Sequence, residues 1–323
     1  MICWHIWRRG YYFFRLYVTK GGVAVKRIRR LFSKIFDFRP ACRRAKSDAD
    51  SRSFGDVNLL FYTCVNEKYF EFALLYPIFV LCSNPGAVVE IGISNMKKFY
   101  KKYAHLVDFY KETYPSRGLF SSVSCRGIFP NSVRFVTQPF LKAKYVYIGD
   151  CDIMVLEEVL EKHLDNIKWN HLDFSNICRK NTRRLSGLHF IEYDKMFPVR
   201  LPAGSCPADD NDEELLYRIM ASKGYKIPDE DKCTYRPVHG LHASYYSRPP
   251  LPTATTEDDF VAFPAWYPAD REESRQIAEK YLNLRYGRQV RDFMSRIREK
   301  DVHLRRIVQF MDISADYVSR RFR

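Results

Sequence analysis

Two carboxylates lie one residue apart in the middle of this chain, directly after an apolar run. Residues 145–148 are the run, and Asp150 and Asp152 follow it in the sequence YVYIGDCDI. Alternate residues of an extended chain point to the same side, so both carboxylates can face one ion if the chain stays extended. Hard cations such as Mn²⁺ and Mg²⁺ prefer oxygen ligands and also bind phosphate oxygens. The pattern therefore predicts a divalent metal site that neutralises a diphosphate; the alternative is a solvated turn.

Two histidines near residue 240 are candidates for further metal ligands. His239 and His242 are three residues apart in RPVHGLHAS. That spacing makes a metal pair on a helix, but Gly240 and Pro237 favour a loop. A zinc site with Cys233 is disfavoured because no second cysteine lies nearby.

The elements that must position these side chains alternate between strands and helices. Residues 57–66 and 88–94 are expected strands, separated by a mostly apolar helix over 67–83. A second helix is expected over 96–113, and the run before Asp150 is a further strand over 144–149. Alternating strands and helices predict a parallel sheet with helices on its faces, and ligands bind at the carboxyl ends of such strands.

The second half of the chain continues this pattern and then becomes helical. Residues 183–197 are expected to form a strand and a turn, and residues 210–225 a helix that Asn211 or Asp212 caps. In the last fifty residues apolar side chains recur at helical spacing, from Val290 to Met311. Docking on the body, self-association into a homo-oligomer and binding to a membrane are all open to this tail.

The positive charge is concentrated at the two ends of the chain. The formal net charge is +15, and residues 1–46 hold thirteen Lys and Arg against the single acid Asp37. Aromatic and apolar residues at helical spacing alternate with these bases, which favours an anionic membrane surface; a helix packed on the body or on a partner is the alternative. Nucleic-acid binding is not expected, because no base-stacking module accompanies the arm.

The cysteines and the apolar segments bear on the compartment. Nine cysteines are scattered and form no Cys-x-x-Cys pair, which favours a reducing compartment. The longest apolar run, 72–82, is too short to span a bilayer, and no signal peptide is evident. We therefore expect a cytoplasmic protein that is peripheral at the inner face of the membrane.

Three segments are expected along the chain. Residues 1–50 form the basic amphipathic arm, 55–248 the catalytic domain, and 249–323 a linker followed by a helical segment.

The order of the motifs resembles a known enzyme family. YVYIGDCD is similar to the Asp-x-Asp motif of nucleotide-sugar-dependent glycosyltransferases of the GT-A fold, especially those related to glycosyltransferase family 8. The segments VNLLFYTCVNEKYF, RLSGLHFIEYDKMF, DNDEELLYRI and RPVHGLHAS are similar to the family's other motifs in the same order, over roughly 57–248. The resemblance implies a GT-A-like fold, with a mainly parallel sheet flanked by helices.

The resemblance also implies a donor site. Asp150 would contact the ribose and the metal, Asp152 would bind the metal, and His239 or His242 would complete the site. The cofactor would be Mn²⁺ or Mg²⁺, and the donor a UDP-sugar. The resemblance places these further residues around the nucleotide base: Tyr62, Thr63, Asn66 and Tyr69.

The remaining implied residues surround the reacting groups. Arg134 would stabilise the diphosphate, and Ser186 and Gly187 would lie against the donor sugar. Asp212 and Glu213 would face the reacting carbon or the acceptor hydroxyl. This chain departs from the family by having a carboxylate at 213 in place of Gln, and it lacks the Lys-Pro-Trp that follows the late histidine. Retention and inversion at the sugar carbon therefore both stay open.

The expected function is a metal-dependent hexosyltransferase. It would move a hexose from the nucleotide-diphosphate sugar to a hydroxyl of a glycan or lipid-linked acceptor in cell-surface polysaccharide synthesis. The basic run 179–184 is either a solvated loop or a clamp for a diphosphate or an anionic acceptor. Two other classes are weighed: a haloacid-dehalogenase-like phosphatase with Asp150 as nucleophile and Asp152 as acid, and a non-catalytic basic peripheral membrane protein.

Overall fold

The computed structural model describes residues 57–179, 182–228, 239–243 and 271–321. The basic arm over 1–50 and the linker that begins at 249 lie outside the described residues. All elements below belong to the unit Ala49–Arg323.

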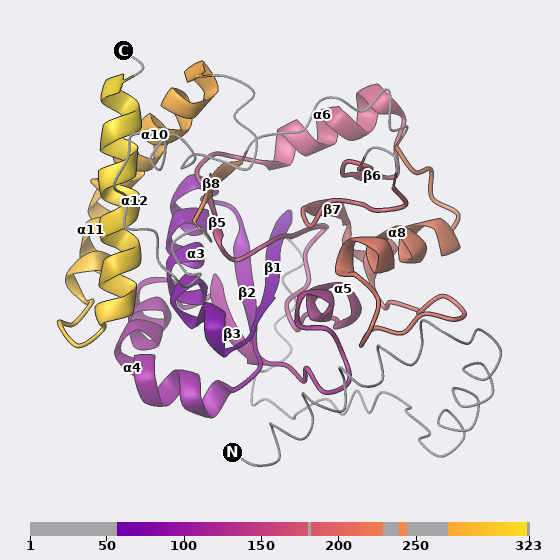
Figure 1. Ribbon diagram of the computed structural model, residues 1–323, viewed down its shortest axis with the longest axis horizontal. Helices are drawn as coiled ribbons and strands as arrows, with labels where there is room; N and C mark the ends of the chain where they lie inside the picture. The colour runs from indigo at the N-terminus through magenta and orange to yellow at the C-terminus, as the bar shows by residue number, and fades with distance from the viewer. Residues whose placement is uncertain (1–56, 180–181, 229–238, 244–270, 322–323) are drawn as a thin grey trace, which may run out of the picture. The chain divides into compact units, whose positions relative to one another are not determined.

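The centre of this unit is a mixed, mainly parallel sheet (Figure 1). The strands lie in the order β3-β2-β1-β4-β7-β6. The first four are parallel, while β7 pairs antiparallel with β4 and β6 pairs antiparallel with β7. The expected α/β class with a mainly parallel sheet is therefore confirmed. The strand bounds are β1 Leu59–Val65, β2 Val88–Ile93, β3 Gly118–Ser122, β4 Tyr145–Ile148, β6 Phe174–Ser175 and β7 His189–Glu192.

The crossover between β1 and β2 is a buried helix. After the short 3-10 turn η1 (Glu67–Tyr69), α3 runs over Phe70–Ser83, and its residues from Phe70 to Leu81 are all buried. A helix that is apolar all round is stable only when it is covered on every side. Here α3 lies between the sheet and the C-terminal helices (Figure 1).

The next helix is amphipathic and lies at the edge of the same layer. Helix α4 covers Met96–Thr113, the range expected from the sequence, and Asn95 accepts a hydrogen bond from the backbone of Lys98 at its start. Its apolar side chains, among them Phe99 and Leu106, are buried. Its lysines lie on the exposed side.

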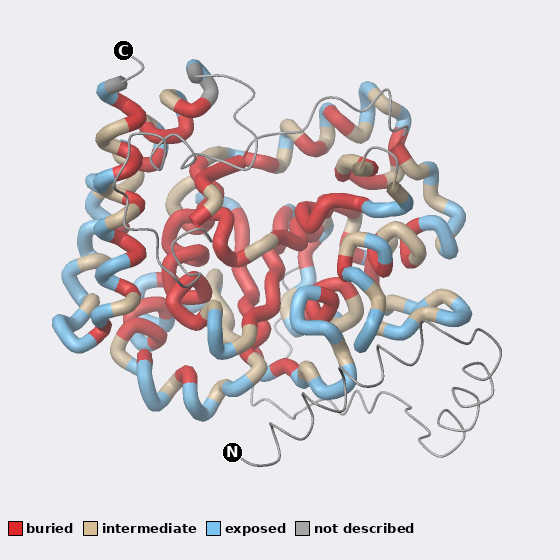
Figure 2. Tube along the Cα trace, in the orientation of Figure 1, coloured by how far each residue is buried: buried red, intermediate tan, exposed pale blue. Residues whose placement is uncertain are grey.

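Successive residues of β1 belong to two different hydrophobic clusters, one on each face of the sheet. Leu59 and Phe61 pack with α3, α4 and the C-terminal helices. Leu60 and Tyr62 pack in a second cluster with α5 (Val133–Val136), α7 (Tyr193–Met196) and α8 (Asp212–Ser222). Because side chains alternate across a strand, this division makes three layers, and Figure 2 shows that the sheet between them is buried.

The C-terminal helices pack on the body. They are α10 (Arg271–Arg285), α11 (Arg288–Ser295) and α12 (Val302–Arg321), and they share the α3 cluster. The rings of Phe79 in α3 and Tyr281 in α10 have centroids 5.5 Å apart. Docking is therefore the outcome for this tail. In the described part of the chain, no helix combines the length and apolar character that crossing a bilayer requires.

A second, two-stranded sheet was not expected from the sequence. Strand β5 (Ile153–Val155) pairs antiparallel with β8 (Gly240–His242), so that Ile153 lies opposite His242. Helix α6 (Leu160–Asn170) follows β5. Strands of three residues carry too little periodicity to be recognised locally. This pairing brings the Asp-x-Asp segment next to a residue ninety positions later in the chain.

Candidate functional site

A cavity of about 190 Å³ opens at the carboxyl ends of β1 and β4. Open α/β sheets bind ligands at this place. Sites for drug-sized ligands span about 300–1,000 Å³, so the described residues enclose only part of the volume that a nucleotide sugar fills. The lining residues are Cys64, Val65, Asn66, Tyr69, Pro130, Asn131, Arg134, Asp150, Cys151, Asp152, Gly187, Asp212, Glu213 and His242.

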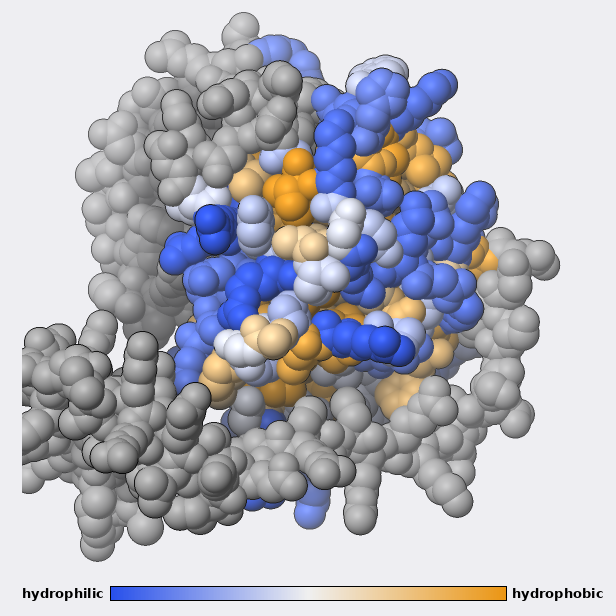
Figure 3. All heavy atoms as spheres, turned by 90° about the vertical axis from the view of Figure 1, so that its right-hand side faces the viewer, coloured by the Kyte–Doolittle hydropathy of each residue, from blue (hydrophilic) through white to orange (hydrophobic). Residues whose placement is uncertain are grey.

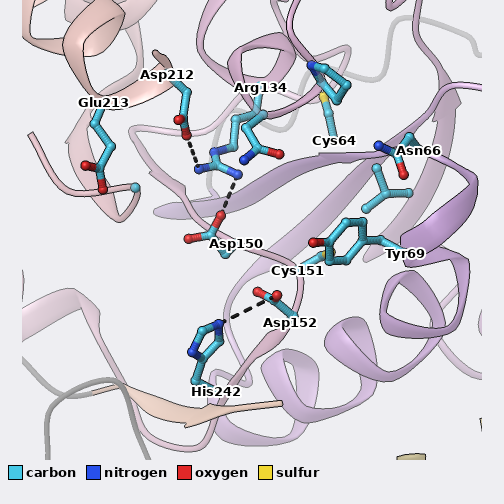
Figure 4. A pocket seen from close by; sticks show the side chains of 14 residues that line it. Cys64, Asn66, Tyr69, Arg134, Asp150, Cys151, Asp152, Asp212, Glu213 and His242 are labelled. Atoms are coloured by element: carbon cyan, nitrogen blue, oxygen red, sulfur yellow. Dashed lines mark hydrogen bonds and ion pairs between the residues drawn. The ribbon is translucent and has the colours of Figure 1, made fainter. Parts of the chain in front are cut away.

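Asp150 and Asp152 both line the cavity, but they have different partners (Figure 4). The chain does not stay extended after β4. It turns, and the amide of Ile153 donates a hydrogen bond of 3.2 Å to the carbonyl of Asp150. The condition under which the two carboxylates face one ion is therefore not met in this arrangement. Asp150 points to Arg134, and Asp152 points to His242.

Arg134 lies between two carboxylates that come from distant parts of the chain. Its Nη1 is 2.6 Å from Asp150 Oδ1, and its Nη2 is 3.3 Å from Asp212 Oδ2. The guanidinium is buried and stacks over the ring of Phe135, with 4.7 Å to the ring centroid. Arg134 therefore forms ion pairs with both carboxylates, and it joins the end of β4 to the start of α8.

Burial and charge act in opposite directions on this pair. Burial favours the neutral form of Arg134, but Asp150 and Asp212 outweigh it and raise the Arg134 pKa. Burial raises the pKa of Asp150; Arg134 opposes that rise, while Asp152 and Asp212 add to it. Among the described residues that line the cavity, there are thus more carboxylates than guanidinium groups.

Gly187 gives the Arg134–Asp150 pair its space. A Cβ at this position would stand 2.9 Å from Arg134 Nη2 and 2.9 Å from Asp150 Oδ2, closer than real Cβ contacts. The sequence resemblance predicts a small residue here because of the donor sugar, and the structure adds a second reason, since a larger side chain would also collide with the protein's own ion pair. Ser186, its neighbour, is buried away from the cavity and donates its hydroxyl to Asn176 Oδ1 over 2.8 Å.

Only one of the two candidate histidines lines the cavity. His242 Nε2 is 3.6 Å from Asp152 Oδ2, which is beyond hydrogen-bond length. His239 is buried on the other side of the strand, 3.4 Å from Glu157 Oε1 and against the ring of His163. Three positions on a strand place two side chains on opposite faces, and this is why the two histidines separate.

The metal prediction can be tested against these donors. Within the described ranges, no three His, Cys, Asp or Glu side chains are grouped so as to hold an ion. Asp152 and His242 nevertheless present an oxygen and a nitrogen 3.6 Å apart. Donors at that separation suit two ligands of one cation bound at about 2.0–2.2 Å. They fit two ligands of a metal site, and Asp150 fits a third only if it leaves Arg134.

Helix α8 brings two more carboxylates to the cavity from its first turn. Asn211 caps the helix by accepting from the amides of Glu213 and Glu214. Asp212 then points to Arg134. Glu213 accepts a hydrogen bond from Arg179, which belongs to the basic run 179–184.

The residues expected around the nucleotide base separate into two groups. Asn66 and Tyr69 line the cavity just after β1. Tyr62 and Thr63 lie within β1 and are fully buried; Tyr62 accepts a hydrogen bond from Cys64 and packs edge-on against a ring of the second cluster. A strand inside a sheet covered on both faces buries its side chains, and only its end reaches the cavity.

Five lining residues were not singled out from the sequence. Cys64 and Val65 stand at the end of β1, and their place just before Asn66 was the available signal. Cys151 lies between the two aspartates, where burial and the carboxylates of Asp152 and Asp150 raise its thiol pKa well above the usual range. The other two, in the 3-10 turn η2 (Pro130–Ser132), carry no local signal; they are Pro130 and Asn131.

Comparisons with known proteins give no family assignment by sequence. No family model matches the chain, and no curated protein matches it. Some solved structures are similar to it, at low identity. One is an active-site mutant of LgtC, with a TM-score of 0.32 at 10% identity over 42% of this chain and 57% of that one.

Two further similar structures are bacterial proteins. TarS 1–349 of S. aureus has a TM-score of 0.39 at 10% identity over 81% of this chain and 83% of that one. The glycosyltransferase GlyE of Streptococcus pneumoniae TIGR4 has a TM-score of 0.31 at 11% identity and is covered over 35% of its length, with 43% of this chain. All three TM-scores are below 0.5 and all three identities are below 25%. The roles proposed below therefore depend on the geometry of the cavity.

Proposed function

We propose that this protein is a glycosyltransferase that uses a nucleotide-diphosphate sugar. One observation carries the proposal: Asp150, Asp152, Arg134 and His242 converge in one cavity at the carboxyl end of a parallel strand pair. Separate segments of the chain contribute these side chains to the cavity. A structural Asp-x-Asp turn would not need a histidine and a buried arginine directed at the same space.

The metal would bind on the Asp152 side of the cavity. Asp152 and His242 would hold the ion, and Asp150 would join them after moving from Arg134. A bound Mn²⁺ or Mg²⁺ would neutralise negative charge on the leaving diphosphate. Arg134 would then keep Asp212 as its partner, which leaves no buried charge uncompensated.

The nucleoside would lie at the other end of the cavity. Asn66 and Tyr69 stand there in Figure 4, and Tyr69 offers a ring on which a base can stack. The sugar would then extend from the diphosphate toward Asp212 and Glu213. Either carboxylate would orient the acceptor hydroxyl or act on the reacting carbon, and both stereochemical outcomes remain open.

The proposal also covers the acceptor and the cellular location of the reaction. We infer a hydroxyl on a glycan or lipid-linked acceptor of cell-surface polysaccharide synthesis, reached at the inner face of the membrane. The basis is the sequence of the arm over 1–50, with its bases and aromatic residues. Sedimentation of the full chain with vesicles tests it: binding to anionic vesicles and not to neutral ones supports the location, and a wholly unbound protein contradicts it.

The central test is calorimetry with UDP in the presence and absence of Mn²⁺. UDP is the first probe because the family resemblance implies it. We expect the native protein to bind UDP only with Mn²⁺, and Asp152→Ala to lose that binding. Asp108→Ala is the matched control, since Asp108 is an exposed carboxylate on α4.

Two results would contradict the proposal. UDP binding that is absent, or unchanged by both the metal and Asp152→Ala, removes the basis for a sugar transferase. Hydrolysis of p-nitrophenyl phosphate that depends on Asp150, without any nucleotide sugar, would instead identify a phosphatase.

A further inference from the structure

Arg179 holds Glu213 at one end of the cavity. Its Nη2 donates to Glu213 Oε1, and the side chains of the two are 34% and 14% exposed. Glu213 lines the cavity, so Arg179 stands just behind the cavity wall. The Arg179 side chain is therefore partly exposed, so a ligand that enters from solvent can reach its guanidinium.

The backbone around Arg179 is fixed to the start of α8. Arg179 donates its amide to the carbonyl of Arg184 over 2.8 Å, and its own carbonyl accepts from the hydroxyl of Thr182 over 2.9 Å. The amide of Leu185 donates to the carbonyl of Glu213 over 3.1 Å. These bonds attach the turn to the helix, so the guanidinium has a defined place relative to the cavity.

Among the described residues at this end of the cavity, the charges favour an anionic ligand near Arg179. The lining side chains include four carboxylates and one guanidinium, that of Arg134, which Asp150 and Asp212 already engage. Arg183 and Arg184 lie nearby in the chain, and both residues are exposed to solvent. In Figure 3 the face that includes α8 carries hydrophilic residues with hydrophobic patches between them. Arg179 is thus the cation that a ligand anion can reach by exchange with Glu213.

The position of this cation along the cavity decides which part of the ligand it meets. In Figure 4, Asn66 and Tyr69 lie on one side and Glu213 on the other, with Asp150 between them. On the proposed function, the diphosphate lies at Asp150. Arg179 then lies beyond the diphosphate, beside the transferred sugar and the acceptor.

We propose that Arg179 is a specificity residue that binds an anionic group, a carboxylate or a phosphate, at the sugar end of the site. The group would belong to a uronic acid donor or to a phosphate-bearing acceptor. A guanidinium matches both groups with two parallel hydrogen bonds. This inference rests on the proposed function for the direction in which the donor lies.

Binding of the anion would also release Glu213. While Arg179 donates to it, that oxygen of Glu213 has one lone pair fewer to offer a ligand hydroxyl, and the guanidinium neutralises its charge. Replacement of Glu213 by the ligand's own anion keeps the guanidinium paired with a negative charge and frees the carboxylate at the cavity wall. A ligand without an anionic group would leave the Arg179–Glu213 ion pair intact.

The test compares anionic and neutral probes in calorimetric titrations of the full chain. Without nucleotide, the probes are glucuronate against glucose and glycerol 3-phosphate against glycerol. With Mn²⁺, UDP-glucuronate is compared with UDP-glucose. We expect at least one anionic probe to bind about tenfold or more tightly than its neutral counterpart. Preference for the uronic acid assigns the group to the donor, and preference for glycerol 3-phosphate assigns it to the acceptor.

Three variants show whether the preference depends on the pair. Arg179→Gln should abolish it, and Glu213→Gln should increase it because the guanidinium no longer has a competing carboxylate. Arg288→Gln, a change of an exposed arginine on α11, should leave it unchanged. Native protein that binds anionic and neutral probes equally, or a preference that persists in Arg179→Gln, overturns the inference.

The same data separate this inference from the proposed function. If UDP binds with Mn²⁺ but no preference for anionic probes is seen, the proposed transferase function is supported and the proposed role of Arg179 is contradicted. If the protein binds an anionic probe through Arg179 but does not bind UDP, the anion site is supported and the proposed transferase function is contradicted.

Discussion

Gly240 lies so close to Met154 that a Cβ on the glycine would stand 1.6 Å from the carbonyl oxygen of Met154. The contact belongs to the pairing of β5 with β8, in which Gly240 lies opposite Val155. Two residues later on β8, His242 faces Asp152. The absence of a side chain at 240 is therefore a condition for the approach of histidine and aspartate.

Gly240→Ala should separate β8 from β5 and reduce metal-dependent UDP binding by more than about tenfold. A backbone oxygen cannot move out of the way of a Cβ as a flexible side chain can. The six-stranded sheet does not include this pairing, so the circular dichroism spectrum should change little. Gly86→Ala is the control, since nothing lies within 4 Å of a Cβ there. Equal UDP affinity in both variants would mean that the pairing does not shape the site.

Arg134→Met should destabilise the protein by about 3–5 kcal/mol at pH 7 in urea unfolding. The substitution leaves Asp150 and Asp212 without the cation that compensates them. Arg288→Met, at an exposed position, should cost less than about 0.5 kcal/mol.

The cost of Arg134→Met should depend on pH. Burial already raises the pKa of Asp150, and without Arg134 nothing of comparable size opposes it. An acid whose pKa is higher in the folded state binds a proton on folding, so stability increases as the pH falls through that pKa. The deficit of the variant should thus be smaller at pH 5 than at pH 8. A deficit that is equal at both values would show that Asp150 does not titrate in this range.

Glu157→Gln should weaken the attachment of α10 to the body. Burial alone would raise the pKa of Glu157, but hydrogen bonds from His239, Lys162 and Lys280 lower it to about 2. The hydrogen bonds of ionised Glu157 therefore stabilise the folded protein fully above the pKa of Glu157 in the unfolded chain, about 4.5. This contribution to the free energy of unfolding is lost as the pH falls toward 2. We expect a loss of about 2 kcal/mol at pH 7, allowing for screening, that shrinks below that unfolded value.

The neighbour of Glu157 offers a matched control. Glu158 is exposed, and Glu158→Gln should change the free energy of unfolding by less than about 0.5 kcal/mol at every pH. Urea unfolding of both variants at several pH values measures the difference. Similar losses in the two variants would exclude a specific role for the Glu157 hydrogen bonds.

Substitutions of His242 and His239 should have different effects, because only His242 lines the cavity. His242→Ala should lower Mn²⁺-dependent UDP affinity with less than about 1 kcal/mol of lost stability, because its ring lines the cavity. His239→Ala should instead cost about 2–3 kcal/mol of stability, since it empties a buried space beside His163 and Tyr147. A larger loss of UDP affinity in His239→Ala than in His242→Ala would show that the cavity forms differently when the ligand binds.

The alternation of strands and helices could be predicted from the sequence because it depends on the local spacing of apolar residues. Helix α4 has the expected bounds, and β1, β2 and β4 lie within the expected strands. Strand β3 and helix α6 were not identified. The partly exposed β3 pairs with β2, and that neighbour, rather than its own periodicity, makes it a strand.

The candidate site was predictable as a set of residue types but not as an arrangement. The residue pattern indicated Asp150 and Asp152, the family resemblance implied Asn66 and Glu213, and all four line the cavity. The sequence could not distinguish His242 from His239, because that choice depends on whether the segment is a helix, a loop or a strand.

By itself, the sequence determined that an apolar strand ends in two carboxylates, since hydrophobic patterning and residue type are local properties. Only the tertiary structure decided which partner each carboxylate meets. Asp150 meets Arg134 because a turn after β4 redirects it, and Asp152 meets His242 because β5 pairs with a strand far along the chain. Contacts between residues so distant in sequence depend on the packing of whole elements, and no short stretch of sequence records them.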